Sequence, residues 1–185
     1  MDSGSDLITE ARDFSLQAHK GQIRKLGSLP YFQHPENVAQ ILKEAGFRDE
    51  VIAAAYLHDV VEDTAFSSGD IALKFGPEVA ALVAGNTENK TQSWEERKSH
   101  TIRYARTASL EVKALIAADK LDNLRSILEG YNIQGAAVWN FFKRGKDKQA
   151  WYYSEAAAAV LENLGEPDIP PFFYELSRLA ADLKK

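Results

Sequence analysis

The chain has 185 residues, a formal net charge of −5 and no cysteine. This length favours one domain with a core that needs no crosslinks, and the lack of cysteine excludes disulfides, thiolate metal sites and a nucleophilic cysteine. An acidic chain is a poor candidate for non-specific nucleic-acid binding, which needs a large positive field. The longest apolar run, 51–57, is far shorter than the roughly 20 residues that span a bilayer, and the first residues show no secretory signal. We therefore expect a cytoplasmic protein that binds neither nucleic acid nor membrane.

Apolar residues recur mostly at helical spacing, and alternating strand-like runs are scarce. Proline at the start and glycine at the end mark several segments, as Pro35 and Gly46 do for the second one. The predicted helices cover about 6–21, 34–46, 50–62, 68–76, 77–85, 95–108, 110–128 and 171–185, with an aromatic segment over 137–165. The sequence thus predicts an all-α multi-helix bundle that forms a single domain, with its core over about 6–165 and a C-terminal helix over about 171–185.

Ionisable residues gather at the end of the helix predicted over 50–62. This helix is apolar over 51–57 and then presents His58, Asp59, Glu62 and Asp63. At about 100° per residue, the four fall within one arc of about 140°. Burying a charged carboxylate is costly unless it is paired or bound to a metal. The arc therefore indicates a polar site, and the plain alternative is a helix end whose charges are solvated.

The helix predicted over 110–128 repeats this pattern. Asp119 directly follows four apolar residues, and Asn123 lies about one turn further on the same face. Asp122 falls on a neighbouring face, and we expect it to be exposed. Asp119 belongs either to a functional site or to a local ion pair with Lys120 or Lys113.

A third polar residue stands at a helix start. His34 precedes Pro35, and the proline restricts the backbone of both. The alternative for His34 is a partly exposed capping residue. Two imidazoles and two carboxylates would together make a mixed nitrogen and oxygen set, which suits a divalent ion such as Mn²⁺, Fe²⁺, Zn²⁺ or Mg²⁺. The members of this candidate set are His34, His58, Asp59 and Asp119.

The set resembles the H…HD…D signature of the HD-domain metal phosphohydrolases. More specifically, four segments look like the hydrolase domain of Rel/Spo-type alarmone enzymes and the stand-alone small alarmone hydrolases. These segments are QIRKLGSLPYFQHPENVAQIL, AAAYLHDVVEDT, FGPEVAALVAGNT and AADKLDNLRSI. The resemblance spans about 7–127 and implies a phosphodiesterase-like HD bundle that binds one divalent ion, usually Mn²⁺, on the four candidate residues.

The resemblance also implies a reaction and its residues. The reaction removes the 3′-pyrophosphate of (p)ppGpp and leaves GDP or GTP. Glu62 and Asp63 are implied to activate the attacking water. Arg24 and Lys25 are placed in the nucleotide pocket, where arginine suits phosphate contact or base stacking, and Asn123 near the ribose or the 3′-phosphates. The alternative for the two cations is an ordinary solvated loop.

This sequence departs from the family pattern at position 122, where many relatives carry Tyr or His, and in its C-terminal third. There Tyr152 could close over a nucleotide, or the aromatic residues of 139–152 could simply be core. The departure leaves guanine, adenine or a broader range of bases open, as in (p)ppGpp or (p)ppApp. Two further functions remain open, which are another HD nucleotidase or phosphodiesterase activity and a non-enzymatic nucleotide-binding module with a vestigial site. The sequence does not predict an oligomeric state.

Overall fold

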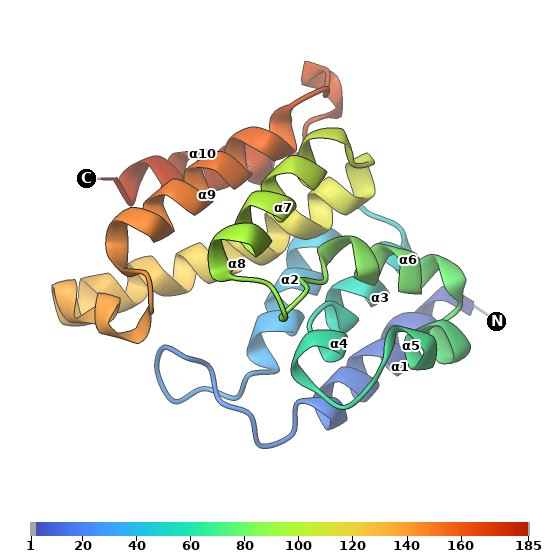
Figure 1. Cartoon of the computed structure of the whole chain (residues 1–185). Helices are drawn as coiled ribbons and strands as arrows, with labels where there is room; N and C mark the ends of the chain where they lie inside the picture. Colours follow the sequence, from blue (N-terminus) through green and yellow to red (C-terminus); the bar gives the residue numbers. More distant parts are fainter. Residues whose placement is uncertain (1–2, 185) are drawn as a thin grey trace.

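A computed structural model describes residues 3–184, with side chains from Asp6 onward, and its regular elements are helices joined by loops (Figure 1). Outside the helices, the described residues form only one isolated β-bridge, between Ile23 and Pro30. The all-α prediction is thus confirmed. In chain order the elements are α1 (Ser3–Ala18), α2 (Gln33–Glu44), α3 (Asp49–Leu57), α4 (Val60–Asp63), α5 (Ser68–Phe75), α6 (Pro77–Asn86), α7 (Trp94–Thr107), α8 (Leu110–Gln134), the 3₁₀ helix η1 (Gly135–Phe141), α9 (Gly145–Leu161), the 3₁₀ helix η2 (Glu166–Asp168) and α10 (Pro171–Asp182).

The helix α3 lies at the centre of the N-terminal half. Six of its nine residues are buried, and it packs against α1, α2, α6 and α8. Three consecutive alanines, 53–55, are fully buried and have no side chain beyond Cβ. Small side chains let neighbouring helices approach from several directions, so an apolar helix with no polar face is the expected occupant of such a place.

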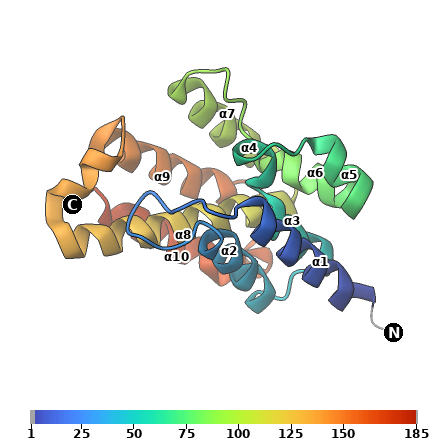
Figure 2. The same cartoon turned by 90° about the horizontal axis from the view of Figure 1, so that it is seen from below.

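The 25-residue helix α8 joins this half to the C-terminal half. Figure 2 shows it passing through the middle of the molecule, where it packs against α2, α9 and α10. Every residue from Val112 to Asp122 is buried. A helix that is covered on all sides loses its solvent face, which is why polar residues within this stretch must find partners inside the protein.

Local sequence signals fix several helix ends. Ser67 and Ser93 each form a capping box, with Asp70 and Glu96 as the third helical residues. The side chain and the backbone thereby satisfy each other's hydrogen bonds at the first turns of α5 and α7. Gly76 ends α5 and begins α6 with a φ of +89°, a backbone conformation that favours glycine.

Two predicted helices differ from the observed ones. The helix predicted over 50–62 is two helices, because His58 and Asp59 form a turn between α3 and α4. The helix predicted over 110–128, for which Gly130 is the expected stop in the sequence, continues to Gln134, and Gly135 ends it with a φ of +60°. Gly130 is instead a contact point, since a Cβ there would come within 3.0 Å of Val138 Cγ2.

The C-terminal third packs back onto α8. Helix α10 contacts both α8 and α9, and its Phe173 and Leu176 are fully buried. The helix predicted over 171–185 is observed as Pro171–Asp182, and Lys185 lies outside the described residues. No helix in the described part of the chain is both long and apolar enough to cross a membrane.

Candidate metal centre and active site

Side chains from α2, the α3–α4 turn and α8 converge on one buried point. His34 Nε2 lies 3.2 Å from His58 Nε2 and 3.3 Å from Asp119 Oδ1. Asp59 Oδ2 lies 3.1 Å from His58 Nε2 and 3.6 Å from His34 Nε2. The ligand atoms of His34, His58 and Asp59 all fall within 4.8 Å of one another. The four residues of the candidate set are therefore brought together, and the turn after α3 is what directs His58 and Asp59 inward.

Both imidazoles are held from behind. His58 Nδ1 lies 2.7 Å from the carbonyl oxygen of Ala55, and His34 Nδ1 lies 2.6 Å from Asp122 Oδ2. A carbonyl and an ionised carboxylate can only accept, so each Nδ1 carries the proton. Each Nε2 is then the atom that faces the convergence point and is free to bind a metal ion there. This is the arrangement that protein metal sites use to fix the ring orientation.

Asp122 corrects an expectation from the sequence. It was predicted to be exposed, but its side chain is only 7% exposed, because the face of α8 next to Asp119 packs against α2. Its two oxygens accept from three donors, which are His34 Nδ1, Arg24 Nη1 at 2.7 Å and Asn37 Nδ2 at 2.8 Å. Hydrogen bonds from His34 and Arg24 overcome the effect of burial and lower the pKa of Asp122.

Asp119 lies in a shell of donors on α8 and α6. Its oxygens accept from Lys120 Nζ at 2.6 Å, Asn123 Nδ2 at 2.7 Å and Asn86 Nδ2 at 3.2 Å. Burial alone would raise the pKa of Asp119, but the charge of Lys120 and the hydrogen bond with His34 hold it well below its usual value. Asp119 thus forms the local ion pair with Lys120 and also faces the convergence point. Lys113, the other predicted partner, donates to the backbone oxygens of Arg106 and Glu162 instead.

Asp59 and His58 form a second charged pair in the site. Burial alone would lower the pKa of His58, but the charges of Asp59 and Asp119 raise it to about 9. The pKa of Asp59 is lowered, because the charges of His58 and His34 overcome its burial. Asp59 Oδ2 also accepts from the Tyr31 hydroxyl, a contact that was not predictable because no local spacing rule connects the loop before α2 to the α3–α4 turn.

Glu62 and Asp63 differ in their surroundings. Burial raises the pKa of Glu62 to about 7, although its Oε1 accepts from the backbone N–H of Glu88, which opposes the shift. Asp63 is exposed and pairs with Lys90 Nζ. The 88–90 segment therefore contacts both carboxylates. Near neutral pH, Glu62 is present in both its protonated and its ionised form. A group with such a pKa is suited to proton transfer.

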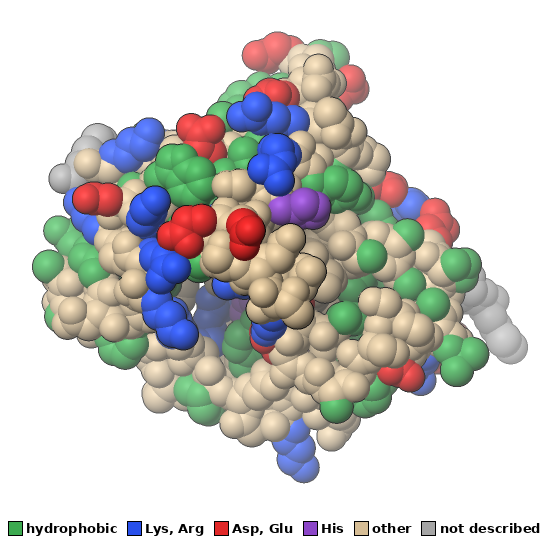
Figure 3. Space-filling model, viewed as in Figure 1, with side chains coloured by type: hydrophobic (Ala, Val, Ile, Leu, Met, Phe, Trp, Pro, Cys, Tyr) green, Lys and Arg blue, Asp and Glu red, His purple; other side chains and the backbone are tan. Residues whose placement is uncertain are grey.

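A small cavity of about 110 Å³ opens beside His34. Three of the predicted substrate residues line it, namely Arg24, Lys25 and Asn123, together with Tyr31, Phe142 and Tyr153. Lys25 Nζ lies 4.6 Å from the centre of the Phe142 ring. On the face drawn in Figure 3, basic side chains gather beside a hollow between the start of α9 and the loop after α1.

Tyr152 lies elsewhere. It is only 2% exposed, it does not line the small cavity, and its ring lies 4.7 Å from Lys98 Nζ and 5.7 Å from Lys120 Nζ. The neighbouring Tyr153 lines the cavity in its place. The sequence does not show which face of α9 turns toward the cavity, so it could not predict that Tyr153 rather than Tyr152 lines it. A substrate contact by Tyr152 stays a prediction.

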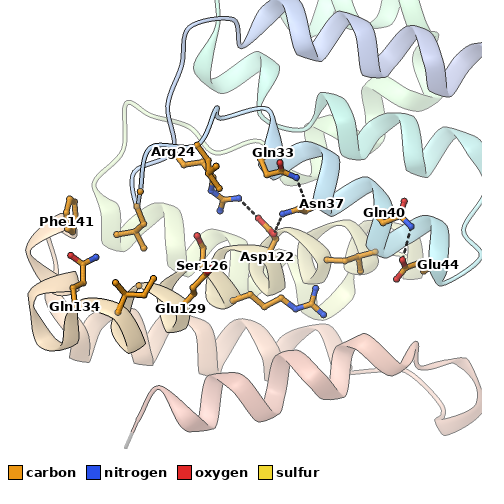
Figure 4. Close-up of a pocket in the computed structure, with 17 residues that line it drawn as sticks. Arg24, Gln33, Asn37, Gln40, Glu44, Asp122, Ser126, Glu129, Gln134 and Phe141 are labelled. Carbon is orange, nitrogen blue, oxygen red and sulfur yellow. Dashed lines mark hydrogen bonds and ion pairs between the residues drawn. The ribbon is translucent and has the colours of Figure 1, made fainter.

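A larger cavity of about 780 Å³ lies between α2, α8 and the loop after α1. Arg24 lines both cavities, and its ion pair with Asp122 forms part of this one. Figure 4 shows Arg24 and Asn37 pointing at Asp122 from two sides, with Ser126 and Glu129 further along α8. The Arg24–Asp122 pair therefore stands between the larger cavity and the metal-ligand candidates.

Known proteins resemble this chain in sequence and in structure. The proteins named guanosine-3′,5′-bis(diphosphate) 3′-pyrophosphohydrolase MESH1 from Xenopus tropicalis and Homo sapiens are each 42% identical over 130 residues, which are 69% of this chain and 73% of theirs. The crystal structure of lmo0812 from Listeria monocytogenes EGD-e matches with a TM-score of 0.79 and 53% identity, over 86% of this chain and 99% of that one.

A second solved structure, described as a metazoan ortholog of SpoT that hydrolyses ppGpp, matches with a TM-score of 0.72 and 29% identity, over 96% of this chain and 93% of its own. The family model for the HD domain matches residues 11–140. This stretch runs from α1 into η1 and includes every residue of the candidate set. The chain belongs to the HD domain family.

Proposed function

We propose that this protein hydrolyses the 3′-pyrophosphate of alarmone nucleotides such as (p)ppGpp, giving the nucleoside 5′-di- or triphosphate and pyrophosphate. The observation that carries the proposal is the convergence of His34, His58, Asp59 and Asp119, inside an HD domain whose relatives bear the name of this hydrolase. A His/His/Asp group in an HD domain indicates a divalent ion.

The donor set fits such an ion. Two imidazole nitrogens with fixed protons on their far sides and two ionised carboxylates are offered at one buried point. Four protein ligands leave an octahedral ion, such as Mn²⁺, with positions for water and substrate. When bound, the ion lowers the pKa of its water and polarises a phosphoryl oxygen. We propose Mn²⁺ as the working ion.

Glu62 is proposed to take the proton of the attacking water. Its pKa of about 7 means that a large share is ionised and able to accept a proton at neutral pH. The backbone N–H of Glu88 holds one of its oxygens and leaves the other for the water. Asp63, exposed and paired with Lys90, is proposed to orient this segment and contribute less to proton transfer.

Substrate binding is proposed to rest on local positive charge, because the chain as a whole carries −5. Arg24 and Lys25 lie on the cavity beside His34 and would contact the phosphates or the base. Asn123 donates to Asp119 and lines the same cavity, which supports a role beside the ribose or the 3′-phosphates. Tyr153 closes this cavity from α9.

The test is a direct assay. Protein loaded with Mn²⁺ is incubated with ppGpp and ppApp side by side, and the products are separated by anion exchange. We expect pyrophosphate and a nucleoside 5′-diphosphate from at least one of them. No cleavage of either, with the metal confirmed in the protein, would overturn the proposal and favour another HD nucleotide hydrolase.

Two variants tie the activity to the site. Asp119→Ala and His58→Ala should each abolish turnover while the helix content measured by circular dichroism stays near that of the parent. Full activity in both would refute the ligand assignment. His100→Gln is the matched control, because His100 is an exposed histidine on α7 away from the convergence point.

A further inference from the structure

Asp122 is tied to both halves of the active site, yet it is not a member of the metal-ligand set. Its Oδ2 accepts from His34 Nδ1 at 2.6 Å and from Arg24 Nη1 at 2.7 Å, so one oxygen atom serves both donors. Its Oδ1 accepts from Asn37 Nδ2. The carboxylate of Asp122 thus accepts hydrogen bonds from three side chains, those of His34, Arg24 and Asn37.

We propose that Asp122 is a positioning residue that couples the metal ligand His34 to Arg24 of the nucleotide pocket. The inference rests on the proposed function for the role of Arg24, and on the geometry alone for the role of His34.

The first half of the coupling concerns the His34 ring. A carboxylate on Nδ1 fixes the proton there, turns Nε2 toward His58 and Asp119, and makes the imidazole a better ligand. His58 has the weaker form of this support, a single backbone carbonyl. The two imidazoles of the site are therefore unequal, and His34 depends more on the residue behind it.

The second half concerns Arg24. Its side chain is only 10% exposed, although it belongs to a loop that follows α1 and carries no helix of its own. A bridge between Ile23 and Pro30 and the bond from Arg24 N to Leu29 O shape this loop, and Asp122 is the anionic partner that the guanidinium meets in the fold. Asp122 thereby holds Arg24 beside the cavity that His34 lines.

The test uses Asp122→Asn, which keeps the size of the side chain and removes its charge. Metal affinity is measured by titration calorimetry with Mn²⁺ and no nucleotide, and KM and kcat are measured separately with ppGpp. We expect the metal affinity to fall by about 10- to 100-fold, which is the usual effect of removing the residue behind a metal-ligating histidine. We also expect KM to rise at saturating Mn²⁺. Metal affinity within twofold of the parent would overturn the proposal.

Two companion variants separate the halves. Arg24→Ala should raise KM and leave the Mn²⁺ affinity near that of the parent, because the His34–Asp122 bond remains. Glu129→Gln is the charge-matched control, an exposed carboxylate on the same helix that also lines the larger cavity, and it should change neither quantity. Equal loss of metal affinity in Glu129→Gln and Asp122→Asn would show a general charge effect and overturn the proposal.

A spectroscopic measurement keeps the proposal testable if Asp122→Asn is too unstable for kinetics. Long-range ¹H–¹⁵N spectra of the Mg²⁺-loaded parent should show a downfield, slowly exchanging proton on His34 Nδ1, and this proton should move upfield or exchange rapidly in the variant. An unchanged signal would refute the role of Asp122. If the parent cleaves no alarmone but Asp122→Asn still loses metal and this signal, the proposed function fails and the positioning of His34 stands.

Discussion

Metal binding to this protein should depend steeply on pH, because His58 must lose a proton before it can bind an ion. In the metal-free protein the pKa of His58 is raised to about 9. At about pH 6.5 only about one His58 in 300 is then neutral, whereas at about pH 8.5 about one in four is. His58 alone therefore predicts that the apparent affinity rises about 75-fold over this range. An imidazole with the ordinary pKa of 6.5 would give a rise of only about twofold.

The partners of His58 sharpen this expectation. Hydrogen bonds to Asp119 and Asp122 overcome the burial of His34 and raise its pKa as well, so His34 can only add to the slope. The pKa values of Asp59 and Asp119 are lowered, and both stay ionised throughout. The assay is calorimetric titration of metal-free protein with Mn²⁺ at both pH values, in two buffers of different ionisation enthalpy, which counts the protons released.

The result that would refute this reasoning is an affinity change of less than about threefold between the two pH values, with no proton released at the lower one. It would mean that the carboxylates around His58 do not hold its proton in solution. His100→Gln should retain the full slope, since His100 lies outside the site.

Three further outcomes follow from the same structure. The metal-free protein should lose up to about 3 kcal/mol of stability between about pH 6.5 and 9. The raised pKa of His58 stabilises the fold below about pH 6.5, and this contribution disappears as the pH rises through about 9. Urea unfolding with a chelator present measures the loss, and a flat stability profile would contradict the prediction. Glu62→Gln should lower kcat by about 10²- to 10⁴-fold and keep the Mn²⁺ affinity within a few-fold of the parent. Asp63→Asn should lower kcat less, and equal losses of kcat in the two variants would argue against Glu62 as the base. Leu121→Ala removes a fully buried side chain from α8 and should destabilise the protein by about 2–5 kcal/mol. A loss of unfolding free energy below about 1 kcal/mol, measured by thermal or urea unfolding, would show that α8 is not the centre of the core.

Helix positions were predictable from sequence because apolar spacing and capping residues are local signals. The helices predicted over 68–76 and 77–85 are observed as α5 and α6, with Gly76 between them. The break at His58 and Asp59 was not predictable, since the residues of α3 and α4 continue the same apolar period. Gly130 was wrongly predicted to end the helix, because this glycine lies inside α8 and allows close contact with Val138.

His58, Asp59 and Asp119 could be predicted because they follow apolar stretches, and His34 because it precedes a proline at a helix start. The residues that support them could not be predicted. Asp122 looked exposed because periodicity gives the face of a helix but not the helix that packs on that face. Tyr31, Asn86 and Glu88 contact Asp59, Asp119 and Glu62 from loops and helix ends. Such contacts join segments far apart in sequence, so only the packed structure reveals them.

The origin of the ligands in three separate parts of the chain has a consequence for biogenesis. His34 and His58 emerge from the ribosome well before Asp119, and α8 must pack against both α2 and α3 before the four groups meet. A nascent chain that lacks α8 holds an incomplete set of donors. The complete set of donors is therefore a late product of folding, and any separation of α2 from α8 would take the set apart.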